Sequence, residues 1–212
     1  MKHPATLLQG GLYAITNGPR PDLLDVVAQA LAGGVQLLQY LDEEPGDARR
    51  HAEATAIAQL CRQHSVPLLI HEDVALAQAV GADGVHLAHS IGAIHAARQS
   101  LGPAAIIGVA CRDSLADARS AVQAGASYVS FGAMYPSPTK PQATIAPVAL
   151  LRQSAALGVA RVAIGGITPD NAGLLIEAGA DYVASISSLF AAPDVRDAAQ
   201  RFARLFHLRE SA

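Results

Sequence analysis

Two adjacent glycines, Gly165 and Gly166, separate a short apolar run from a sequence that could begin a helix. Residues 162–164 before them are short enough for a buried strand, and Thr168-Pro169 after them is typical of a helix N-cap and first helical residue. A strand, a glycine turn and a helix N-terminus together present unpaired N–H groups that favour an anion, most often a phosphate. The same pattern fits a tight turn without a ligand, so this stretch leaves both interpretations open.

A long loop, residues 132–146, carries two hydroxyls and a cation on Ser137, Thr139 and Lys140. Such a loop could close over an anionic substrate and exclude water, and we consider these three residues candidate catalytic groups. The alternative is a solvated polar loop. Its length and its position after a predicted strand favour a functional role.

Three ionisable residues, His71, Glu72 and Asp73, follow another predicted strand. They could include a ligand for a hard metal ion or a general base. The alternative is a helix cap, and we expect Asp73 to cap the helix that begins at Val74. The roles of His71 and Glu72 stay open, with His71 a candidate substrate contact and Glu72 a candidate metal ligand.

Two further histidines and a cysteine lie near strand ends. His86 alternates with apolar neighbours, which is typical of a core histidine with its hydrogen bonds satisfied. His89 lies beyond that strand and could reach the same mouth as His71, but two histidines on different loops are weak evidence for a metal pair. Cys111 has no identified activating base, so we interpret it as a plain strand-end thiol.

The elements that must position these residues form a repeat. A helix-ending glycine followed by an apolar strand recurs at Gly33, Gly81, Gly125 and Gly179. The spacing is roughly 50 residues, enough for two strand-plus-helix units, so four copies imply eight strands. The predicted strands are residues 12–15, 35–40, 67–70, 85–87, 106–110, 129–131, 162–164 and 182–185. The clearest helices are residues 23–31, 48–62, 74–80, 115–124 and 195–208.

Regular alternation of strands and helices predicts an α/β fold, a single (β/α)₈ TIM barrel spanning residues 1–212. Active sites in such barrels lie at the carboxyl ends of the strands, where Gln39 and Tyr40 also fall, so we expect both to contact substrate. The loops after strands seven and eight often bind phosphate together, which strengthens the anion interpretation of Gly165 and Gly166.

Composition sets the class of protein. The 212-residue chain is 51% hydrophobic and 16% charged, with a formal net charge of −3, and these values favour a large buried core over disorder. We expect no nucleic-acid partner because no basic stripe is present, and no membrane because no apolar run approaches a membrane span. The start of the chain lacks the apolar core of a signal peptide, and two unpaired cysteines fit a reducing cytoplasm. Oligomeric state stays open, and a homo-oligomer is possible.

Several segments together resemble the thiamine phosphate synthase family, which also includes thiazole tautomerases. The matching segments are residues 12–16, 33–40, 73–77, 81–87, 136–140, 164–168 and 179–183, and they cover nearly the whole chain. The resemblance implies an eight-stranded barrel that joins an aminopyrimidine methyl diphosphate to a thiazole phosphate with Mg²⁺. It also implies a thiazole-phosphate cradle at Gly165, Gly166, Ile186 and Ser187, a substrate and diphosphate loop at Ser137, Thr139 and Lys140, and a pyrimidine contact at Gln39.

The other half of the implied site departs from the family pattern. Leu41 and Glu43 stand where the family has Arg and Lys, and His71-Glu72 stands where it has Asn-Asp. Ile91 occupies a position where the family has a metal-binding Asp. A diphosphate would lose two cations here and meet an additional acid, so we expect the Mg²⁺–diphosphate half to have diverged while the monophosphate half persists.

Three hypotheses follow. The first is a synthase-like protein whose activity is weakened or lost, with Mg²⁺ as its cofactor if it is active. The second is a cofactor-free thiazole phosphate tautomerase, in which His71 or His89 would replace a base expected where Arg112 stands. The third is a non-catalytic barrel that binds a phosphorylated ligand.

Overall fold

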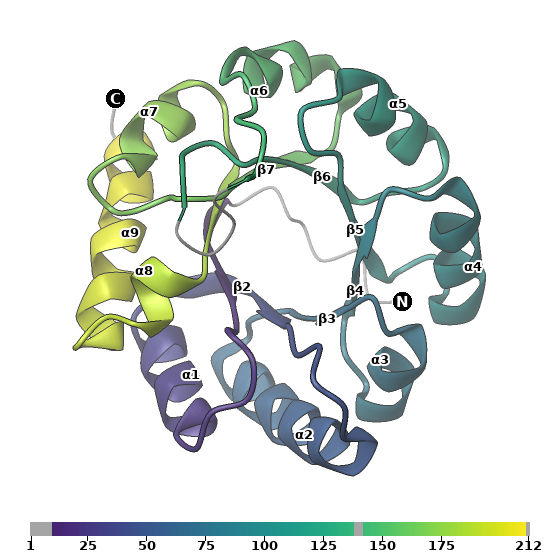
Figure 1. Ribbon diagram of the computed structural model, residues 1–212, viewed down its shortest axis with the longest axis vertical. Helices are drawn as coiled ribbons and strands as arrows, with labels where there is room; N and C mark the ends of the chain where they lie inside the picture. The colour runs from purple at the N-terminus through teal and green to yellow at the C-terminus, as the bar shows by residue number, and fades with distance from the viewer. Residues whose placement is uncertain (1–9, 138–141, 211–212) are drawn as a thin grey trace.

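The computed structural model describes residues 10–137 and 142–210, and its strands close into one parallel barrel in the order β1 to β8. Helices surround the strands on all sides, as Figure 1 shows. The strands are β1 Gly11–Ile15, β2 Val35–Tyr40, β3 Leu68–His71, β4 Gly84–Ala88, β5 Ile106–Ala110, β6 Tyr128–Phe131, β7 Ala160–Ile164 and β8 Tyr182–Ser185. The prediction of a single eight-stranded TIM barrel is therefore confirmed.

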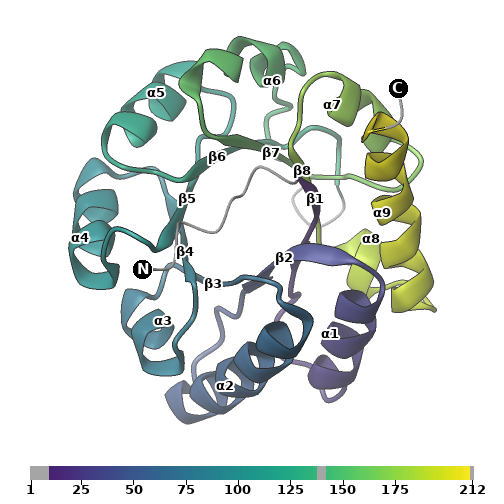
Figure 2. The ribbon, with the colours of Figure 1, turned by 180° about the vertical axis from the view of Figure 1, so that it is seen from behind.

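Helices follow the strands in turn. They are α1 Leu23–Ala32, α2 Asp47–His64, α3 Val74–Val80, α4 Ile91–Leu101, α5 Leu115–Gln123, α6 Ala149–Gln153, α7 Ala172–Glu177, α8 Ser187–Phe190 and α9 Val195–Glu210, with a 3₁₀ turn at Ala155–Leu157. The predicted helices agree with these bounds to within two residues at each end. Seen from behind in Figure 2, α9 lies beside α1 and completes the outer ring.

Side chains of each strand alternate between two cores. In β1, Leu12 and Ala14 pack toward the helices, whereas Tyr13 and Ile15 point into the barrel. This alternation follows from the two-residue period of a strand, and it determines which residues of one strand can share the barrel interior. The interior is filled by side chains and is a packed core rather than a pore.

Close helix packing depends on small residues. A Cβ atom at Gly33 would lie 2.5 Å from the Ala199 Cβ, so the glycine that ends α1 also admits α9. Gly81 ends α3 in the left-handed region at φ 65°, as the repeat predicted. No helix in the described ranges is long and apolar enough to cross a membrane.

The segment after Gly165-Gly166 corrects one prediction. Thr168 does not cap a helix there, because α7 begins only at Ala172. Instead, the Asn171 side chain accepts a hydrogen bond from the Thr168 backbone N–H at 2.9 Å and donates one to the Gly166 carbonyl at 3.0 Å. These two bonds hold a turn, and the start of the helix is displaced toward the C-terminus.

Candidate functional site

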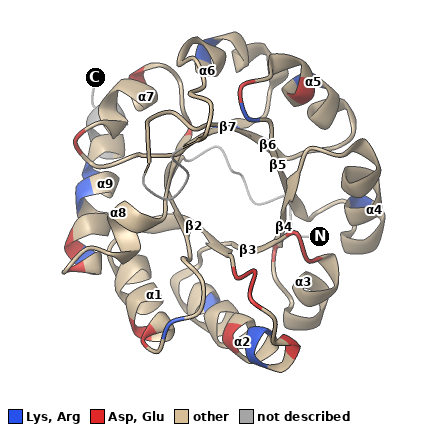
Figure 3. Ribbon diagram, in the orientation of Figure 1, with Lys and Arg blue, Asp and Glu red and all other residues tan. Residues whose placement is uncertain are grey.

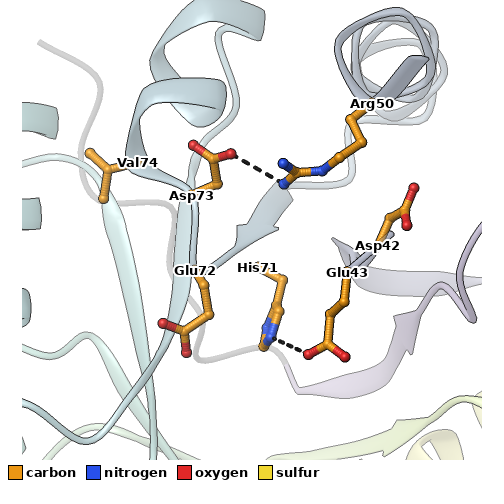
Figure 4. A pocket seen from close by; sticks show the side chains of 7 residues that line it. All are labelled: Asp42, Glu43, Arg50, His71, Glu72, Asp73 and Val74. Carbon is orange, nitrogen blue, oxygen red and sulfur yellow. Dashed lines mark hydrogen bonds and ion pairs between the residues drawn. The ribbon is translucent and has the colours of Figure 1, made fainter. Parts of the chain in front are cut away.

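An open cleft of about 440 Å³ lies between the loops that follow β2 and β3. Figure 4 shows its lining side chains, which are Asp42, Glu43, Arg50, His71, Glu72, Asp73 and Val74. Four of the seven carry carboxylates. Figure 3 shows the same acidic character along both loops.

Two of the four carboxylates are paired with arginines of α2. Arg49 Nη1 contacts Asp42 Oδ2 at 2.5 Å, and Arg50 Nη2 contacts Asp73 Oδ2 at 3.1 Å. Asp73 also accepts from the Leu76 backbone N–H at 2.8 Å, so the predicted helix cap is confirmed. Arginine therefore compensates Asp42 and Asp73, whereas Glu43 and Glu72 meet no arginine in the described residues.

His71 lies between an amide and a carboxylate. Its Nδ1 atom is 3.0 Å from Gln39 Nε2, and its Nε2 atom is 3.6 Å from Glu43 Oε1. The dashed line between His71 and Glu43 in Figure 4 marks the second contact. The Glu43 side chain is 79% exposed and that of His71 22%, so the imidazole faces the cleft from a fixed position beside a movable carboxylate.

Glu72, the candidate metal ligand, has a backbone φ of 57° and accepts from the Ala88 N–H at 2.5 Å. Among the described residues, no three His, Cys, Asp or Glu side chains are grouped so as to hold a metal ion. His89 is also directed elsewhere, because its Nε2 atom lies 2.9 Å from the Ser120 hydroxyl of α5. The described geometry therefore gives no support to a His71–His89 metal pair.

Tyr40 was expected to contact substrate, but its side chain lies on the helix side of β2. The Tyr40 hydroxyl donates to Glu53 at 2.7 Å and to Asp42 at 3.2 Å. Strand alternation explains the difference, because Gln39 points into the barrel and its neighbour must point outward. Tyr40 anchors α2 and does not line the cleft, which corrects that expectation.

Beneath Gln39 a chain of polar groups crosses the barrel interior. The Tyr13 hydroxyl donates to Gln39 Oε1 at 2.6 Å and lies 2.9 Å from the Tyr128 hydroxyl. The Tyr128 hydroxyl in turn lies 2.7 Å from His86 Nδ1. His86 is 8% exposed and bonded, which confirms it as a satisfied core histidine.

Burial keeps this chain uncharged. It lowers the pKa of His86 to about 3, with a smaller contribution from His71. It also raises the pKa values of Tyr13 and Tyr128 well above that of a free phenol. All three groups are therefore neutral at physiological pH.

Tyr13 and Tyr128 did not emerge from the sequence. One signal could have indicated Tyr128, namely a glycine within a neighbouring strand. A Cβ at Gly108 in β5 would lie 1.9 Å from the Tyr128 ring, so this glycine provides space for a large inward side chain.

On the opposite side of the barrel's open end, Gly165 and Gly166 pack against the loop that follows β6. A Cβ at Gly165 would lie 2.7 Å from Ala133, and one at Gly166 would lie 2.6 Å from the Pro136 carbonyl oxygen. The two glycines are therefore needed for the packing of the loop after β6, whether or not a ligand also approaches them. The backbone N–H groups of Gly166 and Ile167 find no acceptor within the described ranges.

The loops after β7 and β8 are joined directly. The Ser188 hydroxyl donates to the Ile167 carbonyl at 2.5 Å and lies 2.7 Å from the Ser185 hydroxyl. Ser187 begins α8, immediately after Ile186. The predicted cradle residues therefore come together at one side of the mouth, while a bound phosphate there stays a prediction.

The remaining candidates divide by position. Ser137 is half-buried in the loop after β6, and Thr139 and Lys140 lie outside the described residues. Cys111 is buried, and burial raises the pKa of its thiol to about 12, which makes it a poor nucleophile. Arg112 is exposed at the end of β5, with φ 52°.

Comparison with known proteins gives concordant results. A family model described as thiamine monophosphate synthase matches residues 12–189. The chain is 53% identical over 201 residues to a thiamine-phosphate synthase of Thiobacillus denitrificans, covering 93% of this chain and 95% of the relative. It is 48% identical over 205 residues to one of Chromobacterium violaceum, covering 94% and 97%. A thiamine phosphate pyrophosphorylase structure from Pyrococcus furiosus superposes with a TM-score of 0.85 at 29% identity, covering 95% of this chain and 98% of that one.

Proposed function

The chain belongs to the thiamine monophosphate synthase family, and from this premise we propose that it is a transferase of thiamine biosynthesis with weakened synthase activity. The proposed reaction joins an aminopyrimidine methyl diphosphate to a thiazole phosphate and releases diphosphate. Identities near 50% over almost the entire length of the relatives support the reaction class. The weakened turnover rests on one feature of the site, the acidic cleft.

The acidic cleft lies where the resemblance expects diphosphate to bind. Glu43 occupies an expected lysine position and lies beside His71, and Glu72 lies close by. Each charged contact to a phosphate is worth about 1.5–3 kcal/mol, and each like charge a few ångströms away costs about 1–4 kcal/mol. Losing two cations and gaining an acid would lower diphosphate affinity by orders of magnitude.

The donor set does not fit a tightly held Mg²⁺. Glu72 already accepts from the Ala88 N–H, and Ile91 stands where the resemblance expects a ligating aspartate. Mg²⁺ requires several oxygen ligands in a near-octahedral arrangement, but two of the four carboxylates in the cleft, Asp42 and Asp73, are already paired with Arg49 and Arg50. We therefore assign this ion no step in the proposed function.

The opposite side of the mouth supports retention of a monophosphate. The free N–H groups of Gly166 and Ile167 could bind phosphate oxygens, together with the start of α8 at Ser187. In this proposal Ser137, Thr139 and Lys140 keep the role that the resemblance implies, contact with substrate and diphosphate, and Gln39 contacts the heterocycle.

Calorimetry with each half-substrate, with and without Mg²⁺, tests the proposal. We expect the thiazole phosphate to bind regardless of Mg²⁺ and the diphosphate to bind weakly in both conditions. Steady-state turnover of both substrates near 1 s⁻¹, an ordinary enzyme rate, would show that synthase activity is intact. Binding of thiazole phosphate without turnover of any related substrate would indicate a non-catalytic barrel.

A second candidate, cofactor-free tautomerisation of thiazole phosphate, is favoured by His71. This imidazole lies at the cleft between Gln39 and Glu43, whereas His89 contacts α5. Proton exchange into thiazole phosphate, followed by NMR in heavy water, measures the activity. His71→Ala should abolish the exchange and His89→Ala should retain it; no exchange by the unmodified protein would exclude this candidate.

A further inference from the structure

The buried polar chain joins five side chains from five strands, namely His71, Gln39, Tyr13, Tyr128 and His86. One end, His71, lies at the cleft and the other end, His86, is buried; the two are register partners on β3 and β4, and their rings stack with centroids 6.4 Å apart. Because burial keeps His86 and both phenols neutral, each has a fixed number of protons to donate. Every hydrogen bond in the chain then constrains the direction of the next.

With His71 neutral, only two directions satisfy all four contacts. In the first, His86 Nδ1–H donates to Tyr128, Tyr128 to Tyr13, and Tyr13 to Gln39 Oε1. The Gln39 amide then donates to His71 Nδ1, which leaves the His71 proton on Nε2. In the second, the amide is rotated and every donor becomes an acceptor, so the His71 proton lies on Nδ1.

Glu43 distinguishes the two directions. His71 Nε2 lies 3.6 Å from its carboxylate oxygen, and a carboxylate accepts but cannot donate. A protonated Nε2 is attracted to this oxygen, whereas a bare Nε2 lone pair is repelled by it. The exposed carboxylate therefore selects the first direction, in agreement with the donation from Tyr13 to Gln39 Oε1.

We propose that Glu43 is a specificity-determining residue that sets the direction of the whole chain through His71, with Tyr13 and Tyr128 as positioning residues. The cleft then presents a donor, His71 Nε2–H, toward a ligand acceptor such as a ring nitrogen or hydroxyl oxygen of an aminopyrimidine. Glu43 holds this donor until a ligand displaces it, which its 79% exposure permits. The identity of the ligand rests on the proposed function, but the direction of the hydrogen bonds does not.

The test reads histidine tautomers by ¹⁵N NMR in the ligand-free full chain, above the pH at which a free imidazole titrates. We expect Nε2–H at His71 and Nδ1–H at His86. Glu43→Lys places a donor beside His71 Nε2 and should move the proton to the other nitrogen in both histidines. Glu43 is exposed, so this substitution leaves the fold intact.

Breaking the chain provides the control. When Tyr13→Phe is added to Glu43→Lys, the proton of His71 should still move to its other nitrogen, but the tautomer of His86 should no longer respond. Tyr128→Phe added to Glu43→Lys should have the same effect. Tyr182→Phe, buried in the same core but outside the chain, should leave the response of His86 to Glu43→Lys intact. A Glu43→Lys protein in which His71 changes and His86 does not would overturn the proposal, as would Nδ1–H at His71 in the unmodified protein.

A ligand arm tests specificity. The phosphate-free aminopyrimidine alcohol is titrated into the unmodified protein, Glu43→Lys and Tyr182→Phe. Loss of one donor should weaken binding about tenfold in Glu43→Lys and leave Tyr182→Phe unchanged. Equal affinity of all three proteins would overturn the role of Glu43 in specificity. Absence of binding to the unmodified protein would count against the proposed function and this specificity role together. The tautomer measurement would still determine the direction of the buried hydrogen bonds.

Discussion

Gly166 lies directly against Tyr135, because a Cβ at Gly166 would stand 2.7 Å from the Tyr135 carbonyl oxygen and 2.8 Å from its Cβ. The backbone there has a φ of 65°. The glycine pair after β7 therefore determines how closely the loop after β6 can pack on it. This contact places Tyr135 and Pro136, which precede Ser137 in the sequence, against one residue of the predicted phosphate cradle.

The first prediction concerns this contact. Gly166→Ala should lower the free energy of unfolding by about 1–3 kcal/mol, since the new methyl group meets backbone atoms and φ is positive. Gly173→Ala is the matched control, because a Cβ there meets nothing within 4 Å and the position is helical. It should stabilise the protein by about 0.5–1 kcal/mol. Denaturant unfolding measures both, and equal effects would contradict the prediction.

The second prediction concerns the acidic cleft. Leu41→Arg combined with Glu43→Lys should increase affinity for inorganic diphosphate at least tenfold, since each new charged contact is worth about 1.5–3 kcal/mol. Glu44→Lys makes the same charge reversal as Glu43→Lys, without the additional positive charge of Leu41→Arg, on an exposed neighbour that does not line the cleft. Calorimetry should detect little change in that control. A similar increase in both proteins would indicate a general effect of charge rather than a local site.

The third prediction concerns pH. Burial lowers the pKa of folded His86 to about 3, below the ordinary value of 6.5, so the unfolded chain binds a proton that the folded chain rejects. Stability should therefore rise with pH between about 3 and 6.5. His86→Gln should remove about 1.5 kcal/mol of the stability difference between pH 5 and 6.5. His64→Gln, at an exposed position, should retain it. Denaturant curves at both pH values measure the difference, and unchanged pH dependence in His86→Gln would exclude this assignment.

The fourth prediction compares two aspartates. Asp73→Ala removes the cap of α3 and the contact with Arg50, and should cost about 1–2 kcal/mol of unfolding free energy. Asp170→Ala removes a 3.0 Å pair with Arg201 whose two side chains are 83% and 49% exposed. Exposed pairs contribute little, so its effect should stay within about 0.5 kcal/mol. Thermal unfolding of both variants provides the measurement, and a larger loss in Asp170→Ala would contradict it.

The sequence by itself determined the barrel and its local signals. Strand and helix periodicity, the repeated glycines and the Asp73 cap depend on neighbours within a few residues, so they could be recognised without the fold. The clustering of Gly165, Gly166, Ile186 and Ser187 also followed, because a closed barrel places the ends of adjacent strands together.

Only the tertiary structure decided the outcome at other positions. Tyr13, Gln39 and Tyr128 are far apart in the chain, and their contacts depend on strand register and on the space left by Gly108. Tyr40 faces outward because its neighbour Gln39 faces inward, and α7 begins late because Asn171 bonds to the turn before it. These features depend on side-chain direction and on non-local hydrogen bonds, which are fixed only when the barrel closes.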